Sequence, residues 1–117
     1  MTRKVSLLLI VALFLTTHVF GQDKVDVIAL RNGISQGTIT VTTSATAIPS
    51  SNLSGRRTII IVNISTSNVF LGDSSVTTAN GYQLYSQQSI SADLADNVTV
   101  YGIVSAGTAE VRTLEAR

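Results

Sequence analysis

Residues 59–62 read IIIV, and this run of four β-branched aliphatic side chains constrains the fold more than any other feature of the chain. Such residues favour extended backbone, and a short apolar run with polar neighbours is typical of a buried β-strand. Thr58 and Asn63 bound the run, so we predict a central strand over residues 58–63. Because neither face of this strand is polar, we expect both faces to be covered by other parts of the protein.

Other short segments have the alternation or the β-branched composition of strands, and turn signals separate them. Residues 43–55 are rich in Ser, Thr and Ala and indicate an extended connection, whereas residues 105–107, Ser-Ala-Gly, indicate a hairpin turn. Strand signals at intervals of about eight to twelve residues are typical of an antiparallel β-sandwich or small barrel. The predicted fold is therefore all-β, with about seven to eight short strands after an N-terminal hydrophobic helix. Besides the central strand, we predict strands within residues 22–30, 38–42, 69–72, 82–85, 89–91, 98–104 and 108–114.

The first 21 residues have the layout of a secretory signal peptide. A basic start is followed by an almost wholly apolar stretch, residues 5–15, and by a small-residue pattern that ends at Gly21. We expect cleavage after Gly21 and export to the periplasm or the outside of the cell. The alternative is a retained anchor that contacts the membrane through residues 5–20. Cleavage would leave residues 22–117 as a single β-sandwich domain, with six basic and seven acidic residues and a net charge of −1.

The side chains on which most enzymes depend are missing from the region after this leader. The chain contains no Cys, and its single histidine is His18, inside the leader. A His-dependent triad, a Cys–His pair and a thiolate metal site are therefore excluded after the leader. We interpret the protein as a non-enzyme without a cofactor or a metal.

The acidic residues offer a weaker route to catalysis or metal binding. Asp73, Asp93 and Asp96 could form a carboxylate pair for hydrolysis, and Asp93-x-x-Asp96 could offer oxygen ligands to calcium. The spacing does not fit an EF-hand loop, and Asp in a turn context has an ordinary structural role. Glu110 and Glu115 fall on the outer face or the tail of a predicted strand. We therefore favour a structural role over chemistry for all of these acids.

Two further patterns bear on partners and modification. Arg56-Arg57 is the only adjacent basic pair after the leader, so the sequence offers no basic patch for nucleic acid. Asn52, Asn63 and Asn97 each begin an Asn-x-Ser/Thr pattern, which matters only in a eukaryotic secretory pathway. The missing basic patch argues against nucleic acid as a partner.

A polar loop at residues 73–81 is the candidate contact site. Tyr82 and Tyr85 follow this loop, three positions apart on a predicted strand, which places them on opposite faces. We expect one ring to pack and the other to be exposed, and an exposed tyrosine beside a loop is a favourable contact residue. The proposed contact residues are Asp73, Ser74, Ser75, Asn80 and Tyr82.

Two parts of the chain resemble a known family. The pattern R-x-x-I-I-I-x-N at residues 56–63 is followed by VFLGDSSVTTANGY-x-L at residues 69–84. The C-terminal part, VTVYG at residues 98–102 and AGTAEVR-x-LE at residues 106–115, fits the same pattern. Together these stretches, which lie within residues 37–115, resemble a small β-sandwich domain of tailed-bacteriophage virion structural proteins.

The resemblance implies a non-enzymatic structural or assembly protein of the capsid-decoration or head-fibre type, which acts by protein–protein contacts and forms a homo-oligomer in a virion. No binding residues can be transferred from the family position by position. An alternative function is a secreted or periplasmic binding module, such as an adhesin or appendage subunit, that recognises a cell surface or a glycan. A leader is not usual in phage virion proteins. Residues 1–21 are thus interpreted as an anchor in a membrane-containing virion, an export signal of a bacterial relative, or a hydrophobic assembly arm.

Overall fold

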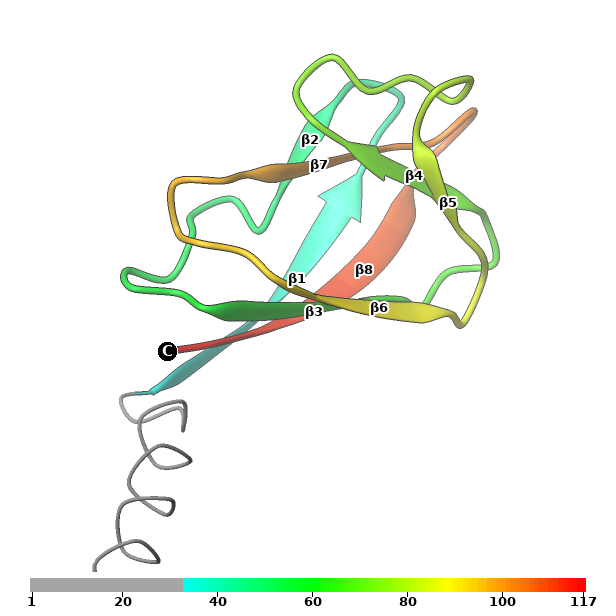
Figure 1. Ribbon diagram of the computed structural model, residues 1–117. Helices are drawn as coiled ribbons and strands as arrows, with labels where there is room; N and C mark the ends of the chain where they lie inside the picture. The colour runs from blue at the N-terminus through cyan, green and yellow to red at the C-terminus, as the bar shows by residue number, and fades with distance from the viewer. Residues whose placement is uncertain (1–32) are drawn as a thin grey trace, which may run out of the picture. The chain divides into compact units, whose positions relative to one another are not determined.

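The computed structural model describes residues 33–117, which form two facing four-stranded antiparallel β-sheets (Figure 1). The predicted leader and the predicted strand at residues 22–30 lie outside the described residues. Within residues 33–117, no helix is long and apolar enough to cross a membrane. The strands are β1 (Ile34–Val41), β2 (Thr46–Ile48), β3 (Thr58–Asn63), β4 (Val69–Gly72), β5 (Tyr82–Leu84), β6 (Ser89–Asp93), β7 (Val100–Ile103) and β8 (Ala109–Ala116).

The order of the strands defines the type of sandwich. The first sheet has the order β1-β8-β3-β6, and the second sheet has the order β2-β7-β4-β5. Consecutive strands alternate between the two sheets, except β4 and β5, which pair with each other. This is the strand order of an eight-stranded jelly roll, a double-sheet arrangement built from two Greek keys. The predicted all-β class, the sandwich and the number of strands are confirmed.

Two local predictions are wrong. Residues 105–107 were expected to close a hairpin, but β7 belongs to the second sheet and β8 to the first. Gly107 does adopt the left-handed conformation expected of a turn glycine, with φ of 67°. Residues 43–55, expected to be a connection, contain the three-residue strand β2. Turn chemistry marks where the chain bends, but it does not tell which sheet the next strand joins.

Inward-facing side chains of the two sheets form the core. Successive side chains of a strand point to opposite faces, so every second residue of β3 and β8 is buried. The prediction that Ala109, Val111 and Thr113 share one face is confirmed, because all three are buried. The core consists of Val41, Ile48, Ile59, Ile61, Val69, Leu71, Leu84, Val104, Ala109 and Val111.

The outer face of β3 differs from the prediction that both faces would be covered. Ile60 points away from the core and is 37% exposed, and its cross-strand partner on β8, Leu114, is 39% exposed. Each sheet packs against the other through one face only. Ile60 and Leu114 lie on the outer face, where they are covered mainly by each other. The β-branched run therefore reflects strand propensity as well as burial.

Candidate functional site

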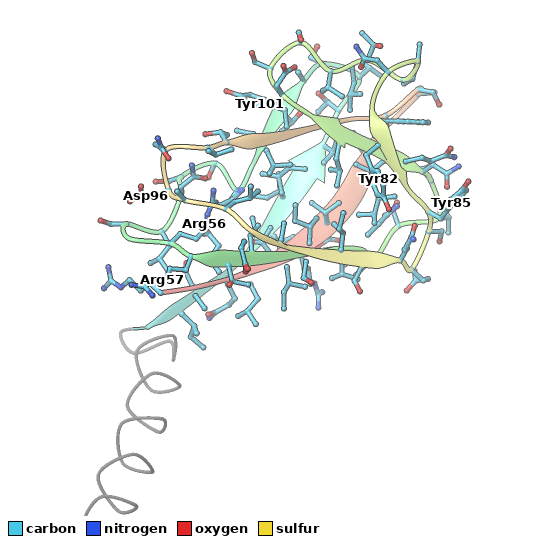
Figure 2. The ribbon with its side chains drawn as sticks, viewed as in Figure 1. Arg56, Arg57, Tyr82, Tyr85, Asp96 and Tyr101 are labelled. Atoms are coloured by element: carbon cyan, nitrogen blue, oxygen red, sulfur yellow. The ribbon has the colours of Figure 1, made fainter. Side chains whose placement is uncertain are left out.

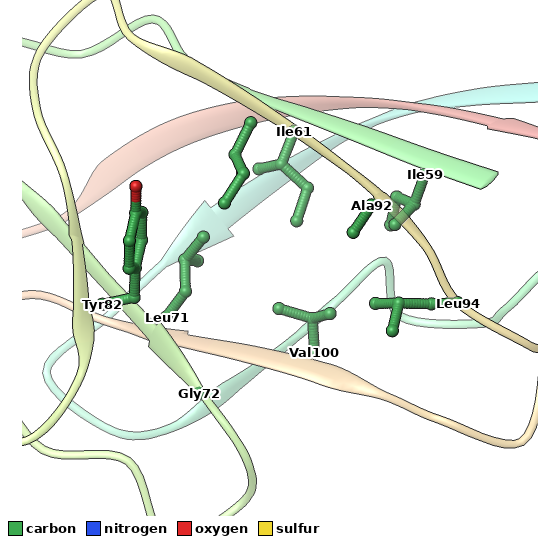
Figure 3. Close-up of a pocket in the computed structure, with 9 residues that line it drawn as sticks. Ile59, Ile61, Leu71, Gly72, Tyr82, Ala92, Leu94 and Val100 are labelled. Carbon is green, nitrogen blue, oxygen red and sulfur yellow. The ribbon is translucent and has the colours of Figure 1, made fainter.

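An apolar pocket lies between the two sheets on the side where β5 and β6 form the sheet edges. Its volume is about 230 Å³. Figure 3 shows Tyr82 on one side of the pocket and Leu94 on the other, with Ile61, Leu71 and Val100 between them. The lining residues are Ile59, Ile61, Leu71, Gly72, Tyr82, Ile90, Ala92, Leu94 and Val100.

The pocket exists because small or half-exposed residues face each other at this edge. Ile59 and Ile61 are buried core residues on one side of the pocket. Ala92, on the edge strand β6, is too small to fill the space in front of them, and Ile90 beside it is only partly buried. The two sheets are thus incompletely packed here. Such a gap forgoes the dispersion contacts that a filled core would make.

Further along β7 the same interface is tightly packed. Gly102 lies two residues beyond the pocket residue Val100 on the inward face of that strand. A Cβ atom placed on Gly102 would lie 2.6 Å from Ile48 Cδ1 and 3.3 Å from Val69 Cγ1. The pocket is therefore a local feature of the β5–β6 side and not a general looseness of the sandwich.

The chemistry of the pocket suits an apolar occupant. Within its lining the polar side-chain atom is the Tyr82 hydroxyl, and the Tyr82 side chain is 58% exposed. Small-molecule sites usually combine an apolar wall with several convergent polar groups, which this lining does not provide. A dry cavity of about 150 Å³ can hold a benzene molecule. The pocket can therefore accept one large apolar side chain.

The predicted contact loop borders the pocket through its two ends. Gly72 precedes the loop, Tyr82 follows it, and both line the pocket. The carboxylate of Asp73 accepts hydrogen bonds from the Ser75 backbone N–H at 2.9 Å and from the Ser75 hydroxyl at 2.6 Å. These two bonds, the hydroxyl bond first, hold the pKa of Asp73 below its usual value of 3.8. Ser74 is exposed in the same turn.

The second half of the loop is held by Asn80 and by a buried valine. The Asn80 side-chain oxygen accepts a bond from the Thr77 backbone N–H at 2.8 Å, and the Thr77 hydroxyl accepts one from the Asn80 N–H at 3.2 Å. Val76 is buried beneath the loop. A Cβ on Gly81 would lie 2.7 Å from Phe70 Cβ and 2.9 Å from Val76 Cγ2, so the Asn80-Gly81 signal marks close packing. The loop thus presents ordered polar groups.

The prediction that one of the two tyrosines packs and the other is exposed is wrong. Tyr82 and Tyr85 are 58% and 55% exposed, and Figure 2 shows both near the β5 side of the molecule. Strand β5 ends at Leu84, which is fully buried, and Tyr85 begins the following turn. Tyr82 shares the inward direction of Leu84 but lies at the mouth of the pocket, where one flank of its ring is open to solvent. Tyr82 therefore lines the pocket, whereas Tyr85 is exposed just after β5.

The sequence did not reveal that the charged side chain of Arg56 is buried. Its guanidinium donates five hydrogen bonds: Nε to the Leu94 carbonyl, Nη1 to Asn52 Oδ1 and Glu115 Oε2, and Nη2 to the Ala95 and Val98 carbonyls. The ion pair with Glu115 is 2.8 Å long and has both side chains buried. Five bonds use every N–H of a guanidinium, so Arg56 has no donor left for a ligand. This cluster is structural.

The prediction that Glu115 lies on the outer face or tail of a strand is wrong, because its carboxylate is buried against Arg56. Glu115 Oε2 also accepts the backbone N–H of Leu53 at 3.1 Å. The alternation of β8 could have predicted that Glu115 is buried, because it places Glu115 on the same face as Val111 and Thr113. Glu110, by contrast, is exposed as expected.

The remaining acids have structural partners. Asp93 accepts a bond from the Thr58 hydroxyl at 3.0 Å, and Asp96 accepts one from the Gly55 N–H at 2.7 Å. Asp73, in the loop that follows β4, accepts a bond from the Ser75 hydroxyl. Residues 33–117 contain no group of three or more His, Cys, Asp or Glu side chains that could hold a metal. The calcium hypothesis thus finds no assembled site in the part of the chain that the structure describes.

The three glycosylation patterns also differ in the folded protein. Asn63 is fully buried, and its amide donates to the Ser67 and Leu84 carbonyls. The Asn52 amide donates to the Asp96 carbonyl at 2.8 Å. Asn97 alone of the three lies exposed in a turn. Folding therefore removes Asn63 as an acceptor and ties Asn52 into the Arg56 cluster.

No protein-family model matches the chain. No curated protein matches it either.

Proposed function

We infer that the protein is a non-enzymatic assembly protein that acts through protein–protein contacts on its β5–β6 side, and we propose a virion decoration or accessory role for it. The observation that carries this inference is the open apolar pocket with the exposed Tyr82 at its mouth. The pocket offers room for an apolar anchor from a partner. Its lining is apolar apart from the Tyr82 hydroxyl, which supports binding over catalysis at this place.

The surroundings of the pocket have the composition of a protein interface. Such interfaces combine an apolar centre, enriched in tyrosine, with a polar rim that remains hydrated. Here the pocket is the centre, Tyr82 supplies an aromatic ring at its mouth, and the loop from Asp73 to Asn80, which joins two lining residues, supplies polar groups for the rim. Residues that fill partner pockets, and tyrosines above all, tend to dominate binding energy.

The virion role rests on two further supports. Jelly-roll sandwiches are common among viral capsid proteins, although lectin domains and cupins share the arrangement. The stretches at residues 56–63 and 69–84, which resemble phage virion proteins, supply β3, β4 and the pocket-side loop. Fold alone does not define function, so the pocket is the feature to be tested.

The direct experiment is co-sedimentation of the full-length protein with virus particles or surface layers from its own source. We expect Tyr82→Ala to weaken binding by about tenfold or more, as for a residue at the centre of an interface. Ala92→Phe, which fills the pocket, should block binding, whereas Arg112→Gln, on the outer face of the first sheet, should not. Unfolding curves for each variant confirm that the fold persists.

A strict lack of binding to particles, with all variants folded, would contradict the virion role. The same proteins on a glycan array then test the alternative. Glycan binding that is lost in Tyr85→Ser would identify a carbohydrate-binding module instead, because exposed tyrosine rings beside polar Asp and Asn groups are also available to sugars. Unchanged particle binding after both Tyr82→Ala and Ala92→Phe would place the contact elsewhere on the surface.

A further inference from the structure

The sandwich has four strand edges within the described residues, and three of them are blunted. Strands at the edge of a sheet present unpaired N–H and C=O groups, which proteins commonly protect with shortness, charge or proline. Strands β2 and β5 have three residues each, and Pro49 follows β2 directly. Strand β6 has five residues and ends in the exposed Asp93. The fourth edge is β1.

Strand β1 has none of these protections. It is eight residues long and reads ISQGTITV, without a charged residue or a proline. It pairs residue for residue with β8 from Ile34↔Ala116 to Val41↔Ala109, so it contains no bulge. Within residues 33–117, β8 is its one paired neighbour. Its other edge is a long, regular and uncharged template for a further strand.

We propose that two copies of the protein pair through β1, antiparallel and about a two-fold axis at Thr38, so that their first sheets join into one eight-stranded sheet. Two-fold symmetry makes such a contact self-complementary and closed, which stops it from growing into a fibre. The main-chain groups of β1 provide the bonds, as in other cases of strand addition. The partner is a second copy of this chain.

The register follows from the alternation of β1. Residues opposite each other in an antiparallel pair lie on the same face, so inward residues of one copy must meet inward residues of the other. An axis at Thr38 satisfies this condition: Thr38 meets Thr38, Gln36 meets Thr40 on the outer face, and Gly37 meets Ile39 on the inner face. An axis at Gly37 would place two glycines opposite each other without side-chain contact. A Thr–Thr pair, in contrast, stabilises a sheet.

Electrostatics also permit this contact. No charged residue lies on β1, so pairing places no like charges opposite each other. The charged residue level with Thr38 is Arg112 on β8. The two Arg112 side chains would be separated by three strand spacings, about 14 Å. That distance exceeds the Debye length of about 8 Å at physiological ionic strength, so their repulsion is screened.

This contact is independent of the proposed partner site. Strands β1 and β6 are the two opposite edges of the first sheet, and the pocket lies on the β6 side. Thr38→Lys should therefore abolish the dimer and leave pocket binding intact. Tyr82→Ala should do the reverse. The two proposals can fail separately.

The absence of cysteine makes cross-linking a clean test. In the full-length protein, Thr38→Cys would place two thiols opposite each other at a Cα separation of about 4.5–5.5 Å, within the range that a disulfide spans. Ser91→Cys is the matched control, because Ser91 is also exposed, outward and central on the opposite edge strand. We expect disulfide-linked dimers to form about tenfold faster for Thr38→Cys, owing to the raised local thiol concentration.

Light scattering of the unmodified protein over about 0.01–1 mM provides the second measurement, in the range expected for a small contact. We expect a concentration-dependent dimer that Thr38→Lys converts to a monomer, because it places two lysines opposite each other. Ser91→Lys should leave the dimer unchanged. Unfolding midpoints establish that both variants are folded. A monomer at every concentration, or equal cross-linking at both cysteines, would overturn the proposal.

Discussion

The segment that joins β6 to β7 lies between two regions that are packed in opposite ways. On one side, its carbonyls at Leu94, Ala95 and Val98 accept hydrogen bonds from the buried guanidinium of Arg56. On the other, the side chain of Leu94 forms a wall of the apolar pocket, which stays open. Within the described residues, every buried side-chain nitrogen and oxygen has a hydrogen-bond partner. The polar cluster is complete, whereas the apolar packing beside it is not.

The difference follows from the physics of the two interactions. A buried charge without partners costs several kcal/mol, so a polar cluster must be fully satisfied if it is to persist. Apolar contact is non-directional, and a gap costs in proportion to its volume. We infer that the Arg56 cluster holds the Leu94 wall of the pocket in position.

The largest effect is expected when the polar side of this comparison is broken. Arg56→Met leaves the carboxylate of Glu115 buried without its cation, and we expect a loss of about 3–5 kcal/mol in the free energy of unfolding. The exposed neighbour provides the control, since Arg57→Met should change stability by less than about 0.5 kcal/mol. Urea denaturation measures both.

A double variant shows whether the cost comes from the unpaired charge. Arg56→Met combined with Glu115→Leu removes both charges and should be more stable than Arg56→Met alone. If the single variant loses less than about 1 kcal/mol, the typical net value of one ordinary hydrogen bond, the cluster does not stabilise the fold as described.

A smaller effect should separate the open and the filled parts of the interface between the sheets. Gly102→Ala adds a methyl group against Ile48 and should cost about 1–3 kcal/mol by overpacking. Ala92→Val adds two methyl groups that face the pocket and should stabilise by about 1 kcal/mol through their burial. The same denaturation experiment compares the two. Equal destabilisation by both substitutions would show that the two sheets are packed as tightly at Ala92 as at Gly102.

The smallest effect concerns the exposed rim, where polar groups are ordered without burial. The hydroxyl and N–H of Ser75 lower the pKa of Asp73. Its carboxylate therefore stabilises the folded state at pH values above 3.8, the usual pKa of this group. That contribution is lost as the pH falls through the lower, folded-state pKa. Ser75→Ala should raise the pKa of Asp73 toward 3.8, measured by NMR titration of the carboxyl carbon. Ser91→Ala should leave it unchanged; a pKa of Asp73 that does not respond to Ser75 would disprove the assignment.

Much of the fold could be predicted from local patterns. The β-branched run predicted β3 to the residue, and alternation in the C-terminal segment predicted the inward face of β8. These predictions succeed because side-chain period and strand propensity are local properties of the chain. The turn at Gly107 was also predicted, since its conformation depends on one residue.

The misses depended on information that is not local. Which sheet β8 joins after the turn, and how little covers Ile60, are set by distant strands. The pair Arg56–Glu115 joins residues that are 59 positions apart in the sequence, and Glu115 was predicted to lie on the outer face or the tail of a strand.

Part of the pocket lining could be anticipated, because Tyr82 lines the pocket and the loop with Asp73, Ser74, Ser75 and Asn80 joins the lining residues Gly72 and Tyr82. That these residues contact a partner stays a prediction. The pocket itself was not predicted, because it arises where Ala92 on one sheet faces Leu71 and Val100 on the other. A lone alanine in a short strand gives no signal that a gap will form around it.

The pairing of β1 with β8 has a kinetic consequence. Ile34 pairs with Ala116, so the first and last strands of the described chain must find each other before the first sheet is complete. Closing so long a loop costs conformational entropy before any stabilising contact repays it. Sandwiches dominated by such distant pairings reach their final state in milliseconds to seconds, far more slowly than helical bundles. Strand β1, which is proposed to pair with another copy, is therefore among the last to be covered. Newly made protein must avoid non-native association until the first sheet is complete.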